Sequence, residues 1–270
     1  MKIQLPWKVH LPLRDPAQRA HVLRALRVAL TLLTIVPARS RDAPATEADV
    51  AAARYAFPVV GLAIGLVLAA LSAALSYGRV APMLSAFLLV AAWAAISGGL
   101  HLDGLADSAD GLFLWGDADR RLAAIRDPHV GSFGLLAIVL VVLGKFAVLS
   151  ILVDRRRVLA LLGAVAVSRT LLLVTAGLAP YARRAGTGRT IVEATTVVDS
   201  LWSIVATFVL GALLAGEVGL LASTLALLVA WGLTHFATQK LGGVTGDILG
   251  AIVETSELAY LVALGLFVTP

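Results

Sequence analysis

Three aspartates follow one apolar stretch of the chain at a spacing that suits metal chemistry. The stretch from Ala81 to Leu100 is apolar apart from small hydroxyls and is long enough to span a bilayer. Asp103, Asp107 and Asp110 come directly after it at i, i+4 and i+7, so a helix would place them on one face. Three like charges on one face repel each other unless a cation lies among them. Hard oxygen ligands suit Mg²⁺, which in such sites holds phosphate groups.

A second acidic segment lies near the C-terminus. Asp247, Glu254 and Glu257 fall at i, i+7 and i+10, roughly on one helical face, among apolar and small residues. We expect these carboxylates to be partly buried, and ionisable groups at membrane depth usually face a cavity, a partner or an ion. The alternative is that all three are simply solvated at the membrane interface.

Basic residues and histidines accompany the acidic segments. Arg126 lies between the aspartates and a glycine-containing turn. An arginine side chain can donate two parallel hydrogen bonds to phosphate oxygens, and glycine lets backbone amides come close to a phosphate. We interpret Arg126 as a phosphate-binding residue. His101 is either a general base or a helix-end histidine bonded to backbone. Lys145 and Arg169 lie inside apolar segments, where they snorkel, pair with a carboxylate or face an internal cavity.

The composition is that of a multi-pass membrane protein. Of the 270 residues, 59% are hydrophobic and 14% are charged, and the mean hydropathy is +0.91. Cysteine is absent, which excludes disulfides, thiolate chemistry, zinc–cysteine sites and iron–sulfur clusters. The net charge of +5 is better explained by membrane topology and attraction to anionic lipid than by nucleic-acid binding.

Hydropathy predicts an all-α, polytopic helical bundle. Six firm spans of roughly 17–22 residues are expected near 57–76, 82–100, 133–153, 158–179, 201–216 and 218–236. Only Gly216 and Glu217 separate the last two, which predicts a tight helical hairpin. Two weaker segments, 22–36 and 258–269, are tilted spans, re-entrant pieces or interfacial helices. Gly61 and Gly65 form a G-x-x-x-G pair that predicts a close-packed helix face.

The two acidic segments are expected on the same side of the membrane, because four crossings separate 101–132 from 237–257. If that side is cytoplasmic, its loops hold ten Lys and Arg residues against four on the opposite side. This bias fits the positive-inside rule, although the triple arginine at 155–157 opposes it locally. We expect a basic N-terminal extension over 1–29, interfacial or disordered, and a single transmembrane catalytic domain over 30–270.

The residues resemble a known family. The run GGLHLDGLADSADGL at 98–112 resembles the signature of cobalamin synthase, also called adenosylcobinamide-GDP ribazoletransferase. The resemblance continues through RDPHVGSFG at 126–134 and through GGVTGD at 242–247 to Glu257. Softer matches lie at 33–37, 57–61 and 180–183, so the resemblance covers about 33–257 in the right order. The first 29 residues are not part of it.

The resemblance implies the last nucleotide-loop assembly step of cobalamin biosynthesis. This family transfers the cobinamide-phosphate moiety of adenosylcobinamide-GDP to α-ribazole or α-ribazole 5′-phosphate, and it releases GMP. It is magnesium-dependent and lies in the bacterial inner membrane with its active site facing the cytoplasm. The implied partners are the two substrates and the lipid bilayer, with other cobalamin-assembly enzymes and an oligomeric state left open.

The implied roles divide the candidate site residues into three groups. The acidic residues are the magnesium ligands, the first three primary and the others completing the cage or acting through water: Asp103, Asp107, Asp110, Asp247, Glu254 and Glu257. The basic residues bind the substrates' phosphates or the GMP leaving group, with the last of them assigned to the ribazole 5′-phosphate: Arg126, His129, Lys240 and Arg183. His101 or one unliganded carboxylate takes the proton of the attacking hydroxyl.

Three other classes of membrane protein are weighed against this interpretation. Residues 103–106, DGLA, resemble the opening of the CDP-alcohol phosphotransferase motif, but Asp107 stands where that family has arginine. An intramembrane prenyltransferase would also use carboxylates to bind magnesium and pyrophosphate. It needs two aspartate-rich motifs, however, and residues 242–257 do not match the second of them. A cation-coupled transporter would place its carboxylates at mid-membrane in broken helices, whereas these are predicted at span ends.

Overall fold

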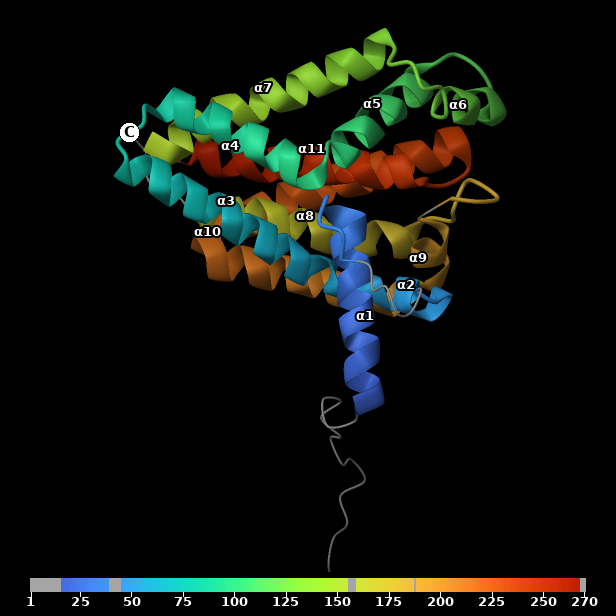
Figure 1. Cartoon of the computed structure of the whole chain (residues 1–270). Coiled ribbons are helices and arrows are strands. Elements are labelled where there is room, and N and C mark those ends of the chain that lie inside the picture. Colours follow the sequence, from blue (N-terminus) through green and yellow to red (C-terminus); the bar gives the residue numbers. More distant parts are fainter. Residues whose placement is uncertain (1–15, 39–44, 155–158, 187, 268–270) are drawn as a thin grey trace, which may run out of the picture.

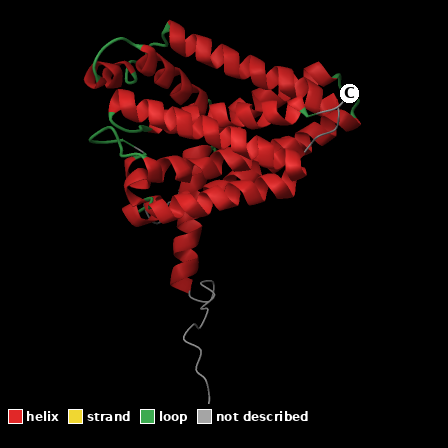
Figure 2. Cartoon of the chain, turned by 180° about the vertical axis from the view of Figure 1, so that it is seen from behind, coloured by secondary structure: helices red, strands yellow, loops and turns green. Residues whose placement is uncertain are grey.

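The computed structural model describes residues 16–38, 45–154, 159–186 and 188–267, which form a bundle of α-helices (Figure 1). Figure 2 shows the same bundle from behind, with no β-strand among the described residues. The elements in chain order are α1 (Pro16–Leu33), α2 (Glu47–Ala53), a 3-10 turn (Arg54–Ala56), α3 (Phe57–Tyr77), α4 (Pro82–Ser97), α5 (Leu100–Phe113), α6 (Ala118–Ala124), α7 (Ser132–Asp154), α8 (Leu159–Leu178), α9 (Arg189–Ala194), α10 (Val197–Leu241) and α11 (Gly246–Leu266).

The long helices confirm a multi-pass membrane protein. Five described helices are long and apolar enough to cross a membrane, or six if the bent pair of α4 and α5 counts as one span. The five are the continuous run of α2, the 3-10 turn and α3 (Glu47–Tyr77), and then α7, α8, α10 and α11. Many of their leucines and valines point outward, as expected where lipid replaces water around the bundle. The predicted all-α polytopic bundle is therefore confirmed.

The helix α10 contains the predicted hairpin. Its backbone leaves the helical region at Ala215 and at Gly216, where φ is 60° and ψ is −140°. Beyond this break the second half of α10 packs back against the first half, since Ser223 Oγ donates a hydrogen bond of 3.2 Å to the carbonyl oxygen of Thr207. A Cβ on Gly211 would lie 3.1 Å from the carbonyl carbon of Gly219, so the two halves approach at glycines.

The break between α4 and α5 turns the first acidic segment away from its span. The two helices meet at an angle of 87°. Gly98 and Gly99 join them with φ of 62° and 73°, a left-handed conformation that only glycine adopts readily. The predicted span over 82–100 therefore ends at Ser97, and the aspartates lie on a separate helix.

The C-terminal region differs from the prediction of a short segment over 258–269. The helix α11 begins at Gly246 and runs to Leu266, so Glu254 and Glu257 lie within a spanning helix and not in a loop at its end. The spacing of Asp247, Glu254 and Glu257 predicted one helical face, as α11 shows, but the C-terminal apolar segment was expected to begin only at residue 258. Cationic partners on neighbouring helices neutralise Glu254 and Glu257, as described below.

The first helix lies across the bundle. Figure 1 shows α1 running roughly at right angles to α3, α8 and α10. It is tied to α2, because His21 and Arg24 both contact Asp49 Oδ1, at 2.8 and 3.2 Å. The predicted boundary between residues 29 and 30 therefore falls inside one continuous helix, and residues 1–15 of the predicted extension lie outside the described part.

The helix α8 forms the centre of the bundle. Most of its side chains are buried, and α3, α10 and α11 all pack against it. A Cβ on Gly61 would lie 3.0 Å from the Cα of Ala166, and one on Gly65 would lie 2.7 Å from the Cα of Leu162. The G-x-x-x-G pair of α3 is thus a close-packing face, as predicted.

Candidate active site

The helices α5 and α11 cross at two glycines. A Cβ on Gly104 would lie 2.9 Å from the carbonyl oxygen of Asp247, and one on Gly250 would lie 3.4 Å from the Cα of His101. The first distance leaves no room for a Cβ at Gly104, and the second brings Gly250 into van der Waals contact with α5. The close approach brings the first aspartates of α5 beside the first turn of α11, although more than a hundred residues of chain separate them.

Four aspartates meet at this crossing. The charges of Asp103, Asp247 and Asp110 all act on the carboxylate of Asp107, the charge of Asp103 most strongly. Asp103 is exposed, whereas Asp107, Asp110 and Asp247 are half-buried. The structure therefore gathers the first acidic segment and the beginning of the second one, as the count of four crossings predicted.

Both carboxylate oxygens of Asp110 accept hydrogen bonds from backbone amides. Its Oδ2 accepts a hydrogen bond of 2.7 Å from the N–H of Gly131, and its Oδ1 accepts one of 2.9 Å from the N–H of Gly134. These contacts hold the loop before α7 against α5. The structure thus shows Asp110 as a tether of this loop, a role that differs from the predicted one of primary metal ligand.

Glu254 and Glu257 lie in a different place. They follow Asp247 by about two and three turns of α11 and are buried in ion pairs. Lys145 Nζ of α7 lies 2.6 Å from Glu254 Oε2 and also contacts Glu257 Oε2, while Arg169 of α8 contacts Glu257 Oε1. The two glutamates thus contact cationic side chains in this structure, whereas the family resemblance implied a place for them in the magnesium site. Within the described residues, no three His, Asp or Glu side chains form an assembled metal cage.

Arg183 lies directly beside the aspartates. Its Nη1 lies 2.9 Å from Oδ2 of Asp247, whereas its Nε and Nη2 are buried and have no hydrogen-bond partner in the structure. Two backbone hydrogen bonds fix the segment that carries it, from Ala182 N to Val244 O at 2.8 Å and from Val244 N to Pro180 O at 2.9 Å. Unpaired buried donors are costly, so this guanidinium is well placed to receive an oxyanion.

The other predicted basic residues are exposed. Arg126 and His129 lie in the loop that Asp110 holds, and both are exposed. His129 Nδ1 lies 2.7 Å from Asp127 Oδ1, and the backbone N–H of His129 holds the pKa of Asp127 below its usual range. Lys240, at the end of α10, is exposed and lies 5.6 Å from the ring centre of Phe236.

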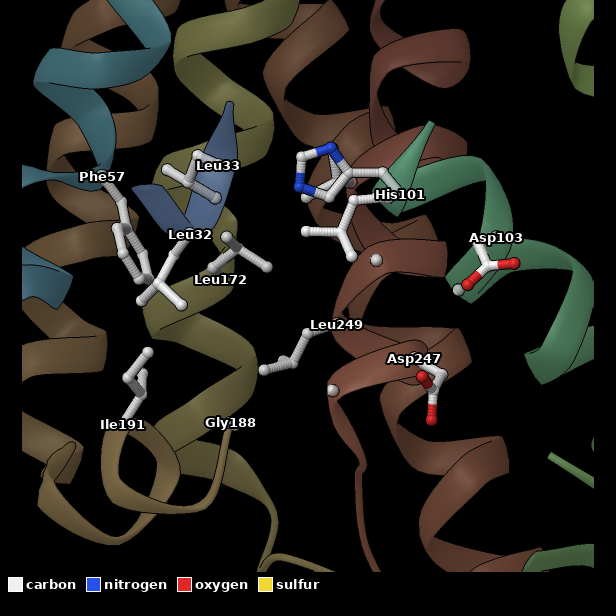
Figure 3. A pocket seen from close by; sticks show the side chains of 15 residues that line it. Leu32, Leu33, Phe57, His101, Asp103, Leu172, Gly188, Ile191, Asp247 and Leu249 are labelled. Carbon is white, nitrogen blue, oxygen red and sulfur yellow. The ribbon is translucent and has the colours of Figure 1, made fainter. Parts of the chain in front are cut away.

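A cavity of about 150 Å³ lies next to the crossing of α5 and α11. Figure 3 shows the His101 ring pointing into it, while the carboxylate of Asp103 points away on the other side of α5. His101 is buried, and its Nδ1 has no hydrogen-bond partner. The structure therefore does not place this ring among the carboxylates, where a general base would be needed.

Sequence reasoning underestimated one cluster of charges. Lys145, Arg169, Glu254 and Glu257 form a single buried network inside the membrane-spanning part. The signal was present, because two lone cations in apolar segments need two anions of similar depth. Pairing a carboxylate was one of the three possibilities considered for Lys145 and Arg169, and the structure selects it for both.

Fold and site together define a multi-pass membrane protein in which carboxylates and a half-buried arginine converge, an arrangement typical of enzymes that act on phosphate esters. The chain belongs to the cobalamin-5-phosphate synthase family, whose model matches residues 25–265. The match confirms the resemblance found in the sequence.

Curated relatives support the same family over nearly their whole length. The adenosylcobinamide-GDP ribazoletransferase of Pseudomonas paraeruginosa strain PA7 is 42% identical over 249 residues, which are 90% of this chain and 98% of that protein. The protein of the same name from Pseudomonas aeruginosa strain UCBPP-PA14 is 41% identical with the same coverage. That from Pseudomonas fluorescens strain Pf-5 is 38% identical over 89% of this chain and 98% of its own. No solved structure matches the chain.

Proposed function

We propose that the protein transfers the cobinamide-phosphate moiety of adenosylcobinamide-GDP to α-ribazole or α-ribazole 5′-phosphate. This is the activity named for its relatives, and it completes cobalamin biosynthesis. One observation supports the location of the active site. Asp103 and Asp107 of α5 converge with Asp247 of α11, beside a half-buried Arg183 whose Nε and Nη2 have no hydrogen-bond partner.

The donor set fits Mg²⁺. Asp103, Asp107 and Asp247 offer only hard carboxylate oxygens, which are the ligands that magnesium prefers. Bound there, the ion would neutralise charge on the pyrophosphate oxygens of the donor substrate. Asp110, Glu254 and Glu257 are left out of the proposed ligand set, since backbone amides hold Asp110 against the loop before α7 and cationic side chains neutralise the two glutamates.

The chain's own residues account for the other parts of the transfer. A hydroxyl oxygen of the ribazole bonds to the phosphorus that carries cobinamide, and the bond from this phosphorus to the bridging oxygen breaks. The electron pair of that bond leaves with GMP. The hydroxyl proton passes to a site carboxylate that does not hold the metal. Arg183 would pair with phosphate oxygens through its free Nε and Nη2.

The exposed basic residues are assigned to substrate capture. Arg126 and His129 lie in the loop that Asp110 holds, and Lys240 lies at the end of α10. All three are exposed, so they can attract a polyanion before it reaches the carboxylates. We place the site on the cytoplasmic side of the bacterial inner membrane, where soluble nucleotides are available. The excess of Lys and Arg in the loops on that side supports this orientation.

The test is a turnover assay on the purified, detergent-solubilised protein. Adenosylcobinamide-GDP, α-ribazole 5′-phosphate and Mg²⁺ are supplied, and GMP and the corrinoid product are measured together. We expect magnesium-dependent GMP release that Asp103→Asn abolishes and that the control Asp119→Asn, on exposed α6, leaves unchanged. If the Asp103→Asn variant still released GMP, the metal site would have to lie elsewhere. No release by well-folded protein would overturn the proposed activity.

A further inference from the structure

The helix α1 lies parallel to the membrane plane. Figure 1 shows it roughly at right angles to the spanning helices α3, α8 and α10, whose axes define the direction across the membrane. A helix perpendicular to the spans does not itself cross the bilayer. The first turns of α1 extend beyond the outline of the bundle in both views (Figures 1 and 2), where no other described helix covers them.

The depth of α1 is that of the membrane surface on the side of the aspartates. Its residues His21 and Arg24 contact Asp49 of α2, which lies about two turns before α3 begins. The chain that follows α1 lies at the break between α4 and α5, since the N–H of Ile35 donates a hydrogen bond of 2.9 Å to the carbonyl oxygen of Ile96. Both contacts lie where apolar helices end, so α1 runs along the boundary between lipid headgroups and hydrocarbon.

The face of α1 that points toward the hydrocarbon is apolar. Successive residues of a helix turn by about 100°, so Leu23 and Leu30 lie about 160–180° around the axis from His21. His21 points toward α2 and contacts Asp49 there, and the two leucines therefore point the opposite way, toward the lipid interior. Leu23 is 52% exposed and its neighbour Val22 is 48% exposed. Acyl chains cover an exposed apolar face at this depth.

The charge of α1 suits an acidic lipid surface. The helix contains three arginines and no acidic residue, and Arg27 among them is exposed. Arg27 follows Leu23 by about one turn, so its long side chain can extend from the edge of the apolar face to the lipid phosphates. The preceding residues 1–15 add Lys2, Lys8 and Arg14 against one acidic residue. Each basic residue near the surface favours acidic over neutral lipid.

We propose that α1 is an interfacial anchor that binds acidic phospholipids. Leu23 and its apolar neighbours insert among the acyl chains, and Arg27 pairs with lipid phosphates beside them. Asp49 fixes the rotation of the helix through His21 and Arg24, so that the apolar face stays turned toward the lipid. The partner is the surface of the bilayer and not a soluble anion or a second protein.

The depth of the anchor can be measured because the chain has no cysteine of its own. The full-length variant Leu23→Cys is labelled with a fluorophore and placed in nanodiscs whose lipids carry a nitroxide quencher either near the headgroup or at the end of the acyl chain. We expect stronger quenching by the nitroxide near the headgroup. Leu140→Cys, exposed on the spanning helix α7, is the lipid-facing control, and Asp119→Cys on exposed α6 is the control in water.

The depth measurement has two results that would overturn the proposal. A label at Leu23→Cys that neither lipid quenches, as expected for Asp119→Cys, would show that this face contacts water or a soluble partner. Stronger quenching from the end of the acyl chain would show that α1 enters the bilayer as a span. If Leu23→Cys fails to fold, Val22→Cys on the neighbouring exposed position gives the same test.

The preference for acidic lipid is measured with the same labelled protein. Nitroxide-labelled phosphatidylglycerol is compared with nitroxide-labelled phosphatidylcholine at low salt, and we expect the acidic lipid to be enriched severalfold around the label. Arg27→Ala should remove most of this enrichment, since one arginine near the surface is worth about a fivefold preference. Arg184→Ala, outside α1, should leave it unchanged. Equal quenching by the two lipids would overturn the preference. No substrate is needed, so the outcome is independent of the proposed transfer reaction.

Discussion

Arg183 Nη1 and Asp247 Oδ2 lie 2.9 Å apart, and this pair joins the segment before α9 to the first turn of α11. Only one of the guanidinium nitrogens is used in the contact, since Nε and Nη2 are buried without partners. The pair therefore holds a cation at the aspartate cluster with part of its hydrogen-bonding capacity free. Such an arrangement is prepared for an anion that arrives with the substrate.

Removing Arg183 should change the choice of acceptor. If its free donors bind the 5′-phosphate, Arg183→Ala should lower kcat/KM for α-ribazole 5′-phosphate about tenfold more than for α-ribazole, because a charge-assisted pair is lost only with the former. Any disturbance of Asp247 affects both acceptors and cancels in the ratio. The control is Arg184→Ala, the exposed neighbour. An equal loss with both acceptors would show that Arg183 does not contact this phosphate.

The buried charge network should contribute to stability and not to metal binding. Lys145→Met leaves Glu254 and Glu257 with one cation fewer and should destabilise the bundle by about 3–5 kcal/mol, the cost of breaking a buried ion pair. Adding Glu254→Gln should recover part of this loss. Both effects are measured by thermal unfolding in detergent.

The same network gives a direct test of the role that the sequence suggested for its glutamates. Glu254→Gln should lower the unfolding temperature while leaving unchanged the Mg²⁺ concentration needed for half-maximal activity. The opposite result, a higher magnesium requirement at unchanged stability, would restore Glu254 as a metal ligand.

The aspartates show which parts of the site local sequence can predict. Helical spacing correctly placed Asp103, Asp107 and Asp110 together, and counting spans correctly put Asp247 on their side. Spacing does not reveal which neighbour each side chain meets. Asp110 faces the glycines before α7, and Glu254 faces Lys145, which is 109 residues away in the chain. Those partners depend on how α7 and α8 pack against α5 and α11.

The length of α11 was mispredicted for the same physical reason. Carboxylates in an apolar run indicate the end of a span unless cations at the same depth pair with them. The cations Lys145 and Arg169 come from two other spans. By contrast, the hairpin at Gly216 and the packing face of Gly61 and Gly65 could be predicted, since glycine at a break or at a four-residue spacing acts through its own backbone.

The crossing of α5 and α11 should tolerate no added side chain. Gly104→Ala places a methyl 2.9 Å from the carbonyl oxygen of Asp247 and must push the helices apart. A displacement of about 1 Å at the carboxylates can lower turnover by about a hundredfold. Alanine otherwise favours a helix over glycine, so Gly232→Ala, which meets no atom within 4 Å, should retain activity. Comparable activity in both variants would show that the close approach does not position the site.

Asp110 should act on the loop before α7 and not on the metal. Its two oxygens accept hydrogen bonds from Gly131 and Gly134, so Asp110→Asn retains one acceptor and Asp110→Ala retains none. We expect a graded rise in KM for adenosylcobinamide-GDP, severalfold for asparagine and tenfold or more for alanine, because this loop carries Arg126 and His129. The concentration of Mg²⁺ that supports half-maximal activity should stay constant in both. A magnesium requirement that rises in step with KM would instead assign Asp110 to the metal, as its spacing with Asp103 and Asp107 first predicted.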